Sequence, residues 1–214
     1  MSRSKHIRTV GLILLVCVTL AAGSWLATES SRAQSESRLA DLALQPQDVS
    51  KDAQWLGAST VDATDVSQPL NRVNVESLSS TPPLDAASVL AYESAYKVEA
   101  VELDENGSGL ATIGHYLYRY PEKTQAQAAS EAIFNTMAQV THGDILDNGA
   151  ATEENGYVGR TLKVSNPEEG TVVNWFVGVN GRTLNLLMVE GLPLPSTQAL
   201  FDGLVNRVLS HQDS

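Results

Sequence analysis

The chain has 214 residues, 43% of them hydrophobic, which suits one medium-sized domain with its own core and a short appendage. Its 14 Lys and Arg against 25 Asp and Glu give a net charge of −11; the first 33 residues hold four of those basic residues and one acid, leaving 10 against 24, or −14, for the remainder. Such an acidic body repels phosphate backbones and anionic bilayers, so we expect no nucleic-acid partner.

The N-terminus has the three zones of an export signal. A basic start leads into the apolar run Val10 to Ala22 and then a polar segment ending in Ser31-Arg32-Ala33, where small residues favour cleavage before Gln34. Counted generously, the apolar run reaches about 17 residues, the lower limit for a membrane-spanning helix. We therefore expect residues 1–33 to be a signal peptide or an N-terminal membrane anchor, with membrane contact through residues 7–26 if the signal is not cleaved.

This signal places the rest of the chain outside the cytoplasm of a bacterium, either secreted or periplasmic, or anchored to the cytoplasmic membrane. The single cysteine, Cys17, lies inside the apolar run, and Val16 stands where a lipoprotein signal prefers a small residue. Lipidation is therefore not expected. Because no second cysteine exists, stability must come from core packing rather than from disulfides.

Residues 34–83 are expected to form an N-terminal extension that is largely loop. Its first part, 34–44, fits either a short helix or a tether, and Trp55 is expected to pack on the sheet rather than bind a ligand. From Gly57 onward Ser, Thr and Asp dominate, and only residues 70–75 alternate like a strand. A structureless stretch of this length is uncommon in a compact domain, which indicates a functional or partly mobile segment.

The domain proper is predicted over residues 84–214. A short helix near its start is followed by strands at 96–103 and 110–120, which form a hairpin with a bulge near Ala100. Residues 124–142 have capping-box spacing, an apolar stripe and a glycine just after the end, so they predict a helix that lies close to the sheet.

The last third of the chain has the clearest pattern. Three strands are joined by a turn at 166–170 and by Asn180-Gly181, a typical type I′ hairpin signal, and a helix at 196–209 follows. Residues 156–164 are nearly repeated 22 positions later. We interpret the repeat as chance similarity between two strands that start at the same end of a meander, rather than as a duplication.

These elements predict an α+β fold, an antiparallel sheet of about five to six strands packed by two main helices, 124–142 and 196–209. The order of hairpin, helix, loop, three-stranded meander and closing helix behind an export signal resembles the PsbP-like α/β/α sandwich domains of photosystem subunits, mycobacterial lipoproteins and the extracytoplasmic sensor ends of some kinases. The likeness is carried by Thr124 to Gly143 and Gly156 to Leu209, by order and spacing alone. It implies a non-enzymatic binding or accessory domain, and no functional residue can be carried over.

Two patterns share features with metal-binding sites. Asp104, Asn106, Ser108 and Gly109 match the first half of a calcium loop, but His115 stands where the bidentate Glu should be, so a plain hairpin turn is favoured.

His142, Asp144 and Asp147 are too few for a zinc site, and His142 is better explained as a cation at a helix C-terminus. We expect no metal and no cofactor.

The sequence offers no catalytic motif. It has no nucleophile elbow and no glycine-rich phosphate loop, and the pairs Glu153-Glu154 and Glu168-Glu169 fall in predicted turns. We assign no catalytic, cofactor-binding or metal residues. If the chain is an enzyme with a dispersed site, His115, His142 and Asp144 are the candidates.

Two further groups have both a structural and a binding interpretation. Tyr96, Tyr116, Tyr118 and Tyr120 could line an aromatic face, although core tyrosines are the commoner explanation. Arg160 and Arg182, near one end of the sheet, could form a docking edge for an acidic group, with ordinary surface arginine as the simpler alternative.

The sequence therefore predicts a non-catalytic extracytoplasmic binding or accessory domain, secreted or singly anchored, that recognises a protein partner or a small ligand. The alternatives are an extracytoplasmic enzyme, such as a hydrolase, and an accessory subunit of a membrane protein complex.

Overall fold

The computed structural model describes residues 38–49, 53–61, 91–104, 106–140, 144–149, 151–154 and 156–210. The predicted signal or anchor, the strand predicted at 70–75 and His142 lie outside the described residues. No helix of these ranges combines the length and hydropathy that crossing a membrane requires.

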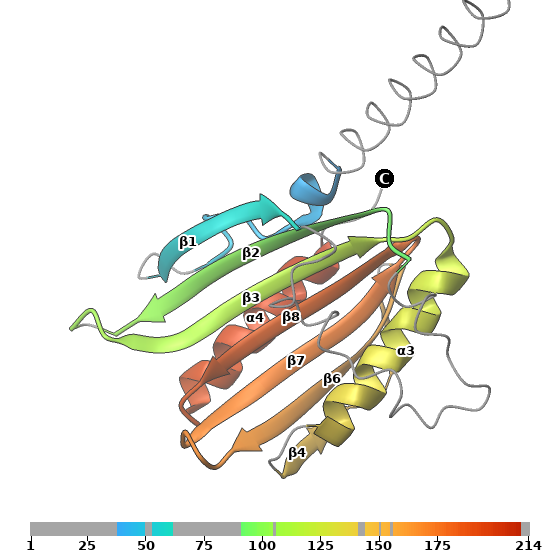
Figure 1. Cartoon of the computed structure of the whole chain (residues 1–214). Coiled ribbons are helices and arrows are strands. Elements are labelled where there is room, and N and C mark those ends of the chain that lie inside the picture. The colour runs from blue at the N-terminus through green and yellow to red at the C-terminus, as the bar shows by residue number, and fades with distance from the viewer. Residues whose placement is uncertain are drawn as a thin grey trace, which may run out of the picture.

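The described chain is built on one antiparallel sheet of eight strands (Figure 1). The strands are β1 (Ala53–Thr60), β2 (Ser94–Leu103), β3 (Gly109–Arg119), β4 (Ile145–Asn148), β5 (Thr152–Glu154), β6 (Tyr157–Asn166), β7 (Thr171–Asn180) and β8 (Thr183–Gly191). They lie in the order β1-β2-β3-β8-β7-β6-β4, and β5 pairs with the same strand β6 as β4 does. The two long helices are α3 (Lys123–Val140) and α4 (Pro195–Ser210).

The predicted fold class, an α+β fold with five to six strands packed by two main helices, 124–142 and 196–209, is wrong. Within the described residues the chain is mostly β, with eight strands and three helices. The third helix is the short one at 38–42. The strands that the sequence did not reveal are β1, an edge strand whose exposed residues are largely polar, and β4 and β5, which are too short to show a period.

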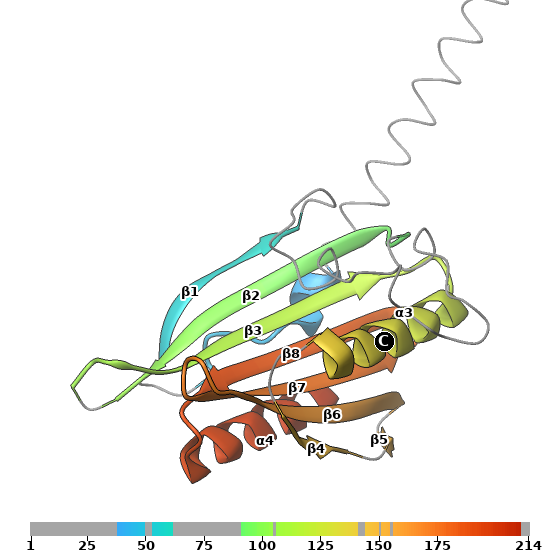
Figure 2. The same cartoon turned by 60° about the horizontal axis from the view of Figure 1, so that its bottom comes forward.

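The sheet is covered on both faces, with α3 on one side and α4 on the other (Figures 1 and 2). On the α3 face, the helix presents three fully buried alanines, Ala126, Ala129 and Ala132, to the strands. Small residues let a helix axis approach a sheet closely. On the α4 face the core includes Phe201, Leu204 and Val208 of that helix.

Residues 38–49 complete the core on the α4 face. Leu39 and Leu44 are fully buried there, and Val49 is nearly so. This segment and β1 fall inside the extension predicted for 34–83, yet the segment packs on the sheet and β1 pairs with β2 along its whole length. The segment therefore contributes to the core, with a helix only at 38–42, and β1 contributes an edge to the sheet.

The bulge predicted near Ala100 lies in the partner strand. Trp55 pairs with Ala100 and Gly57 with Glu99, so Leu56 is the extra residue on β1. Its side chain is 55% exposed, whereas Trp55 packs against the α4-side core, as expected.

The glycines of the near-repeat have exchanged roles. Gly156 and Gly181 adopt positive φ angles of 81° and 57° in turns. Their repeat counterparts, Gly178 and Gly159, are directly paired across β6 and β7, and a Cβ on either would lie 2.5 to 2.6 Å from the ring of Phe176. Matching glycines of the near-repeat thus have different structural roles, one in a turn and the other in a strand pair. This agrees with chance similarity rather than duplication.

The hairpin turn is one residue later than predicted. Asn180 pairs with both Tyr157 and Thr183, so it belongs to β7, and the two central residues are Gly181 and Arg182. The positive φ of Gly181 suits the first central position of a primed turn.

Candidate functional site

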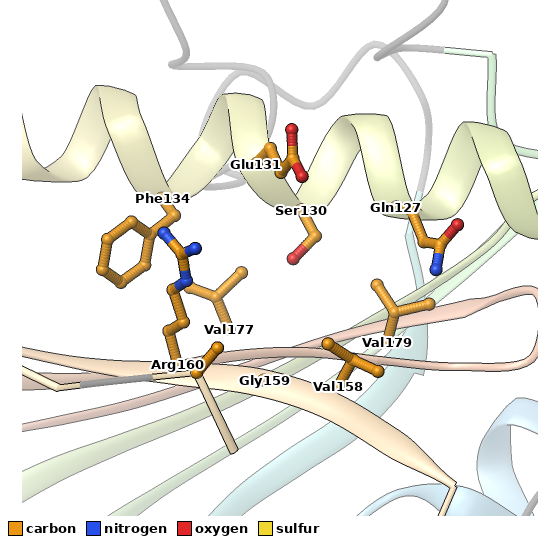
Figure 3. Close-up of a pocket in the computed structure, with 10 residues that line it drawn as sticks. Gln127, Ser130, Glu131, Phe134, Val158, Gly159, Arg160, Val177 and Val179 are labelled. Atoms are coloured by element: carbon orange, nitrogen blue, oxygen red, sulfur yellow. The ribbon is translucent and has the colours of Figure 1, made fainter. Parts of the chain in front are cut away.

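A pocket of about 250 Å³ lies between α3 and the strands β6 and β7 (Figure 3). Its floor is made by side chains of the sheet and its wall by one side of the helix. The lining residues are Gln127, Ser130, Glu131, Phe134, Ala151, Val158, Gly159, Arg160, Val177 and Val179.

The floor follows from strand pairing. Val158 pairs with Val179 and Arg160 with Val177, and because strand side chains alternate, all four point to the α3 face. Val177 and Val179 are buried, but Val158 is 41% exposed. The floor is therefore apolar and partly open to solvent.

The wall follows from helix spacing. Gln127, Ser130, Glu131 and Phe134 stand three, four and seven positions apart, so they share one side of α3 next to the alanines that touch the sheet. Ser130 and Gln127 point from the helix toward the strands, while Glu131 lies at the outer rim (Figure 3). The wall thus offers a hydroxyl, an amide and a carboxylate.

Arg160 stands against the aromatic ring of this wall. The guanidinium carbon of Arg160 is 5.4 Å from the centroid of the Phe134 ring, within the range of a cation–π contact (Figure 3). The ring is nearly buried, whereas Arg160 is exposed. Between the described residues, no ion pair joins Arg160 to Glu131. The pocket therefore presents one cation and one anion that do not neutralise each other by direct contact.

This arrangement suits binding of a small ligand. Among the described residues that line the pocket, the hydroxyl is that of Ser130, and no His, Lys or Cys stands with it. What it does contain is an apolar floor with a few convergent polar groups, which is the usual composition of a ligand pocket.

The histidine and aspartate proposed for a dispersed catalytic site are not brought together. Nδ1 of the buried His115 accepts a hydrogen bond of 3.2 Å from the backbone N–H of Leu44. Asp144 is exposed, and its backbone bonds to Ser165 of β6, three strands from β3. At a strand spacing of ~4.8 Å, the three steps from β3 to β6 alone separate the two residues by about 14 Å across the sheet, so they are farther apart than one site allows. His142 is outside the described residues.

The first half of the calcium pattern forms a self-contained turn. Oδ1 of Asp104 accepts the backbone N–H groups of Asn106 and Ser108 at 2.8 and 2.7 Å. These bonds, that of Ser108 first, hold the pKa of Asp104 below its ordinary value of 3.8. Within the described ranges no three His, Cys, Asp or Glu side chains gather as a metal site would require.

The four tyrosines do not form one face. Tyr116, Tyr118 and Tyr120 belong to the core on the α3 side, whereas Tyr96 packs on the α4 side. The ring of Tyr118 lies edge-on to that of Tyr92 at 5.2 Å, and burial raises the pKa of Tyr120. The four tyrosines therefore do not form an aromatic binding face. Tyr96 lies on the α4 face of the sheet, and Tyr116, Tyr118 and Tyr120 are core residues on the α3 face.

The two arginines also separate. Nη1 of Arg182 donates to the carbonyl oxygen of Pro121 at 3.0 Å and fastens the β7–β8 turn to the chain before α3. Arg160 lies in the pocket instead. The sequence singled out Arg160 but missed its partners on α3, although the spacing of Gln127, Ser130 and Phe134 beside the apolar stripe was a signal that could have found them.

No protein-family model and no curated protein sequence matches this chain. Among solved structures, it is similar to the extracellular domain of PknH from Mycobacterium tuberculosis, with a TM-score of 0.51. The match covers 81% of this chain and 95% of that domain at 13% identity, which shows a common fold and nothing more. The match is compatible with the extracytoplasmic part of the predicted resemblance, while a PsbP-like fold is not confirmed.

Proposed function

We propose that this chain is a non-catalytic extracytoplasmic binding domain of the sensor or accessory type, secreted or held at the membrane by residues 7–26. It recognises a small ligand in the pocket beneath α3. The observation that carries the proposal is the pair of opposite charges, Arg160 and Glu131, that line one apolar pocket without forming an ion pair in the described structure.

Three other observations support it. The N-terminal sequence has the zones of an export signal. The remainder of the chain is strongly acidic, so anionic surfaces repel it. The fold is similar to that of the PknH extracellular domain. Of the candidate catalytic residues, His115 is buried and its Nδ1 accepts a backbone N–H, whereas Asp144 is exposed and lies beside a different strand, β6.

The test is a ligand screen with a blocked pocket. Ala151 lines the pocket and is exposed, so Ala151→Trp should fill the space without disturbing the core. Ala199→Trp, at an exposed position on α4, is the matched control. We expect at least one member of a metabolite library to raise the melting temperature of the full-length chain and of the Ala199→Trp variant, but not of Ala151→Trp.

Two outcomes would contradict the proposal. One is a ligand that stabilises all three proteins equally, since it would bind elsewhere. The other is a library without any ligand together with a membrane protein that co-purifies equally with the wild type and with Ala151→Trp, which would point to a protein partner on another surface.

A further inference from the structure

We infer that the pocket binds a small zwitterion of the amino-acid type, with its carboxylate on Arg160, its ammonium near Glu131 and an aliphatic side chain on the valine floor. This inference rests on the proposed function of the pocket and narrows its ligand to one chemical class.

The charges of the lining lead to this class. Arg160 and Glu131 belong to facing elements, β6 and α3, and line the same space, yet the described structure gives them no ion pair with each other. A ligand with a single charge would be attracted by one of them and repelled by the other. A ligand that carries both charges a few bonds apart satisfies both.

The contact between Arg160 and Phe134 determines which group of the ligand goes where. The Phe134 ring lies against the guanidinium at 5.4 Å, so the ring face is already occupied by a cation and cannot cage a second one. The planar guanidinium keeps N–H donors at its edge, which suit the two oxygens of a carboxylate. The carboxylate therefore belongs at Arg160, and the ammonium at the carboxylate of Glu131.

The size and the floor of the pocket limit the rest of the molecule. A volume of about 250 Å³ equals the space of roughly eight water molecules in the liquid and is below that of drug-sized sites. Val158, Val177 and Val179 offer contact to an aliphatic group, and Ser130 and Gln127 can hydrogen-bond to the polar end. A single amino acid fits these limits better than a peptide or a nucleotide.

The charge of the whole molecule favours the same class. The part of the chain after residue 33 carries 10 basic against 24 acidic residues, so its field repels anions that approach the pocket. A zwitterion has no net charge and is not excluded by this field, whereas a phosphate or a dicarboxylate is.

The experiment is calorimetric titration of the full-length chain with glycine, alanine, valine and leucine, and with two analogues of leucine. 4-Methylpentanoate keeps the carboxylate and lacks the ammonium; 3-methylbutylamine keeps the ammonium and lacks the carboxylate. We expect one or more of the aliphatic amino acids to bind, and each leucine analogue to bind at least about tenfold more weakly than leucine, because each leaves one charged group of the pocket without its counterpart.

Matched variants locate the two charges. Arg160→Gln and Glu131→Gln should each weaken amino-acid binding by about tenfold or more. Arg207→Gln on α4 and Glu168→Gln in the β6–β7 turn remove the same charges at exposed positions outside the pocket and should leave the affinity within about twofold.

The inference would be overturned by 4-methylpentanoate binding as tightly as leucine, by full affinity in the Glu131→Gln variant, or by the absence of binding for all four amino acids. Each of these results would still allow the pocket to bind a ligand of another class. The screen with the Ala151→Trp variant tests the proposed function separately.

Discussion

Leu44 donates its backbone N–H to Nδ1 of His115 over 3.2 Å, although the two residues are 71 positions apart in the chain. The bond joins the segment 38–49 to the middle of β3, and both residues are fully buried. A histidine that was a catalytic candidate in the sequence thus accepts a hydrogen bond from the end of the segment predicted to be either a short helix or a tether.

Shortening the side chain of Leu44 should therefore destabilise the whole domain. Because Leu44 is fully buried in the α4-side core, Leu44→Ala should lower the free energy of unfolding by about 2–5 kcal/mol. Leu56→Ala, the same change at a side chain that is 55% exposed, should cost less than about 0.5 kcal/mol. Urea denaturation measures both; equal small effects would mean that residues 38–49 are not part of the cooperative unit.

The paired glycines of β6 and β7 should tolerate no side chain. A Cβ on Gly159 or Gly178 would lie 2.6 or 2.5 Å from the Phe176 ring, so either Gly→Ala variant should lose about 1–3 kcal/mol through overpacking. Gly203 in α4 has no neighbour within 4 Å of such a Cβ, and Gly203→Ala should instead gain about 0.5–1 kcal/mol of helix propensity. Opposite signs in thermal unfolding are the expected result, and stabilisation of all three variants would contradict the packing account.

Removal of the Phe134 ring should weaken the pocket more than the fold. Phe134→Leu keeps an apolar side chain, so it should cost about 1 kcal/mol of stability, but it takes away the surface on which Arg160 rests. The affinity for a carboxylate ligand should fall by about two- to fivefold, as expected for an exposed cation–π contact. Phe201→Leu makes the same change in the core of the opposite face and should leave the affinity unchanged; parallel losses in both variants would indicate a general effect of destabilisation.

The turn at Asp104 should make a pH-dependent contribution. Because the folded-state pKa of Asp104 lies below its ordinary value of 3.8, the stabilisation is present above that pH and is lost as the pH falls through the folded-state value. The melting temperature of Asp104→Asn should lie below that of the wild type at pH 7, and the two should converge once the pH is below the folded-state pKa of Asp104. Calcium should change neither curve, since the same carboxylate oxygen already accepts two backbone N–H groups.

The strands and helices with a clear period were predictable from the sequence. Residues 96–103 and 110–120 correspond to β2 and β3, and both long helices start and end close to their predicted positions. The number of strands was not predictable. β1 is an edge strand with mostly exposed side chains, and β4 and β5 are only four and three residues long. Short edge strands are stabilised by their neighbour β2 or β6 rather than by their own periodicity.

The candidate site was predictable only in part. Arg160 was singled out because basic residues are scarce in the acidic part of the chain. Its place in the candidate site depends on the α3 residues that line the same pocket. That Phe134 and Glu131 stand opposite Arg160 depends on how α3 crosses β6 and β7, a tertiary arrangement that no local pattern encodes. For the same reason Arg182, which has an equivalent sequence context, is fastened to Pro121 and takes no part.

The segment 38–49 and the candidate pocket lie on opposite faces of the sheet, the segment on the α4 face and the pocket on the α3 face. Figure 2 shows the two helices on these opposite sides. A protein immobilised at the start of the described domain has its attachment point and the candidate pocket on opposite sides of one sheet. Occupancy of the pocket can therefore be measured on immobilised protein without the tether competing for the same surface.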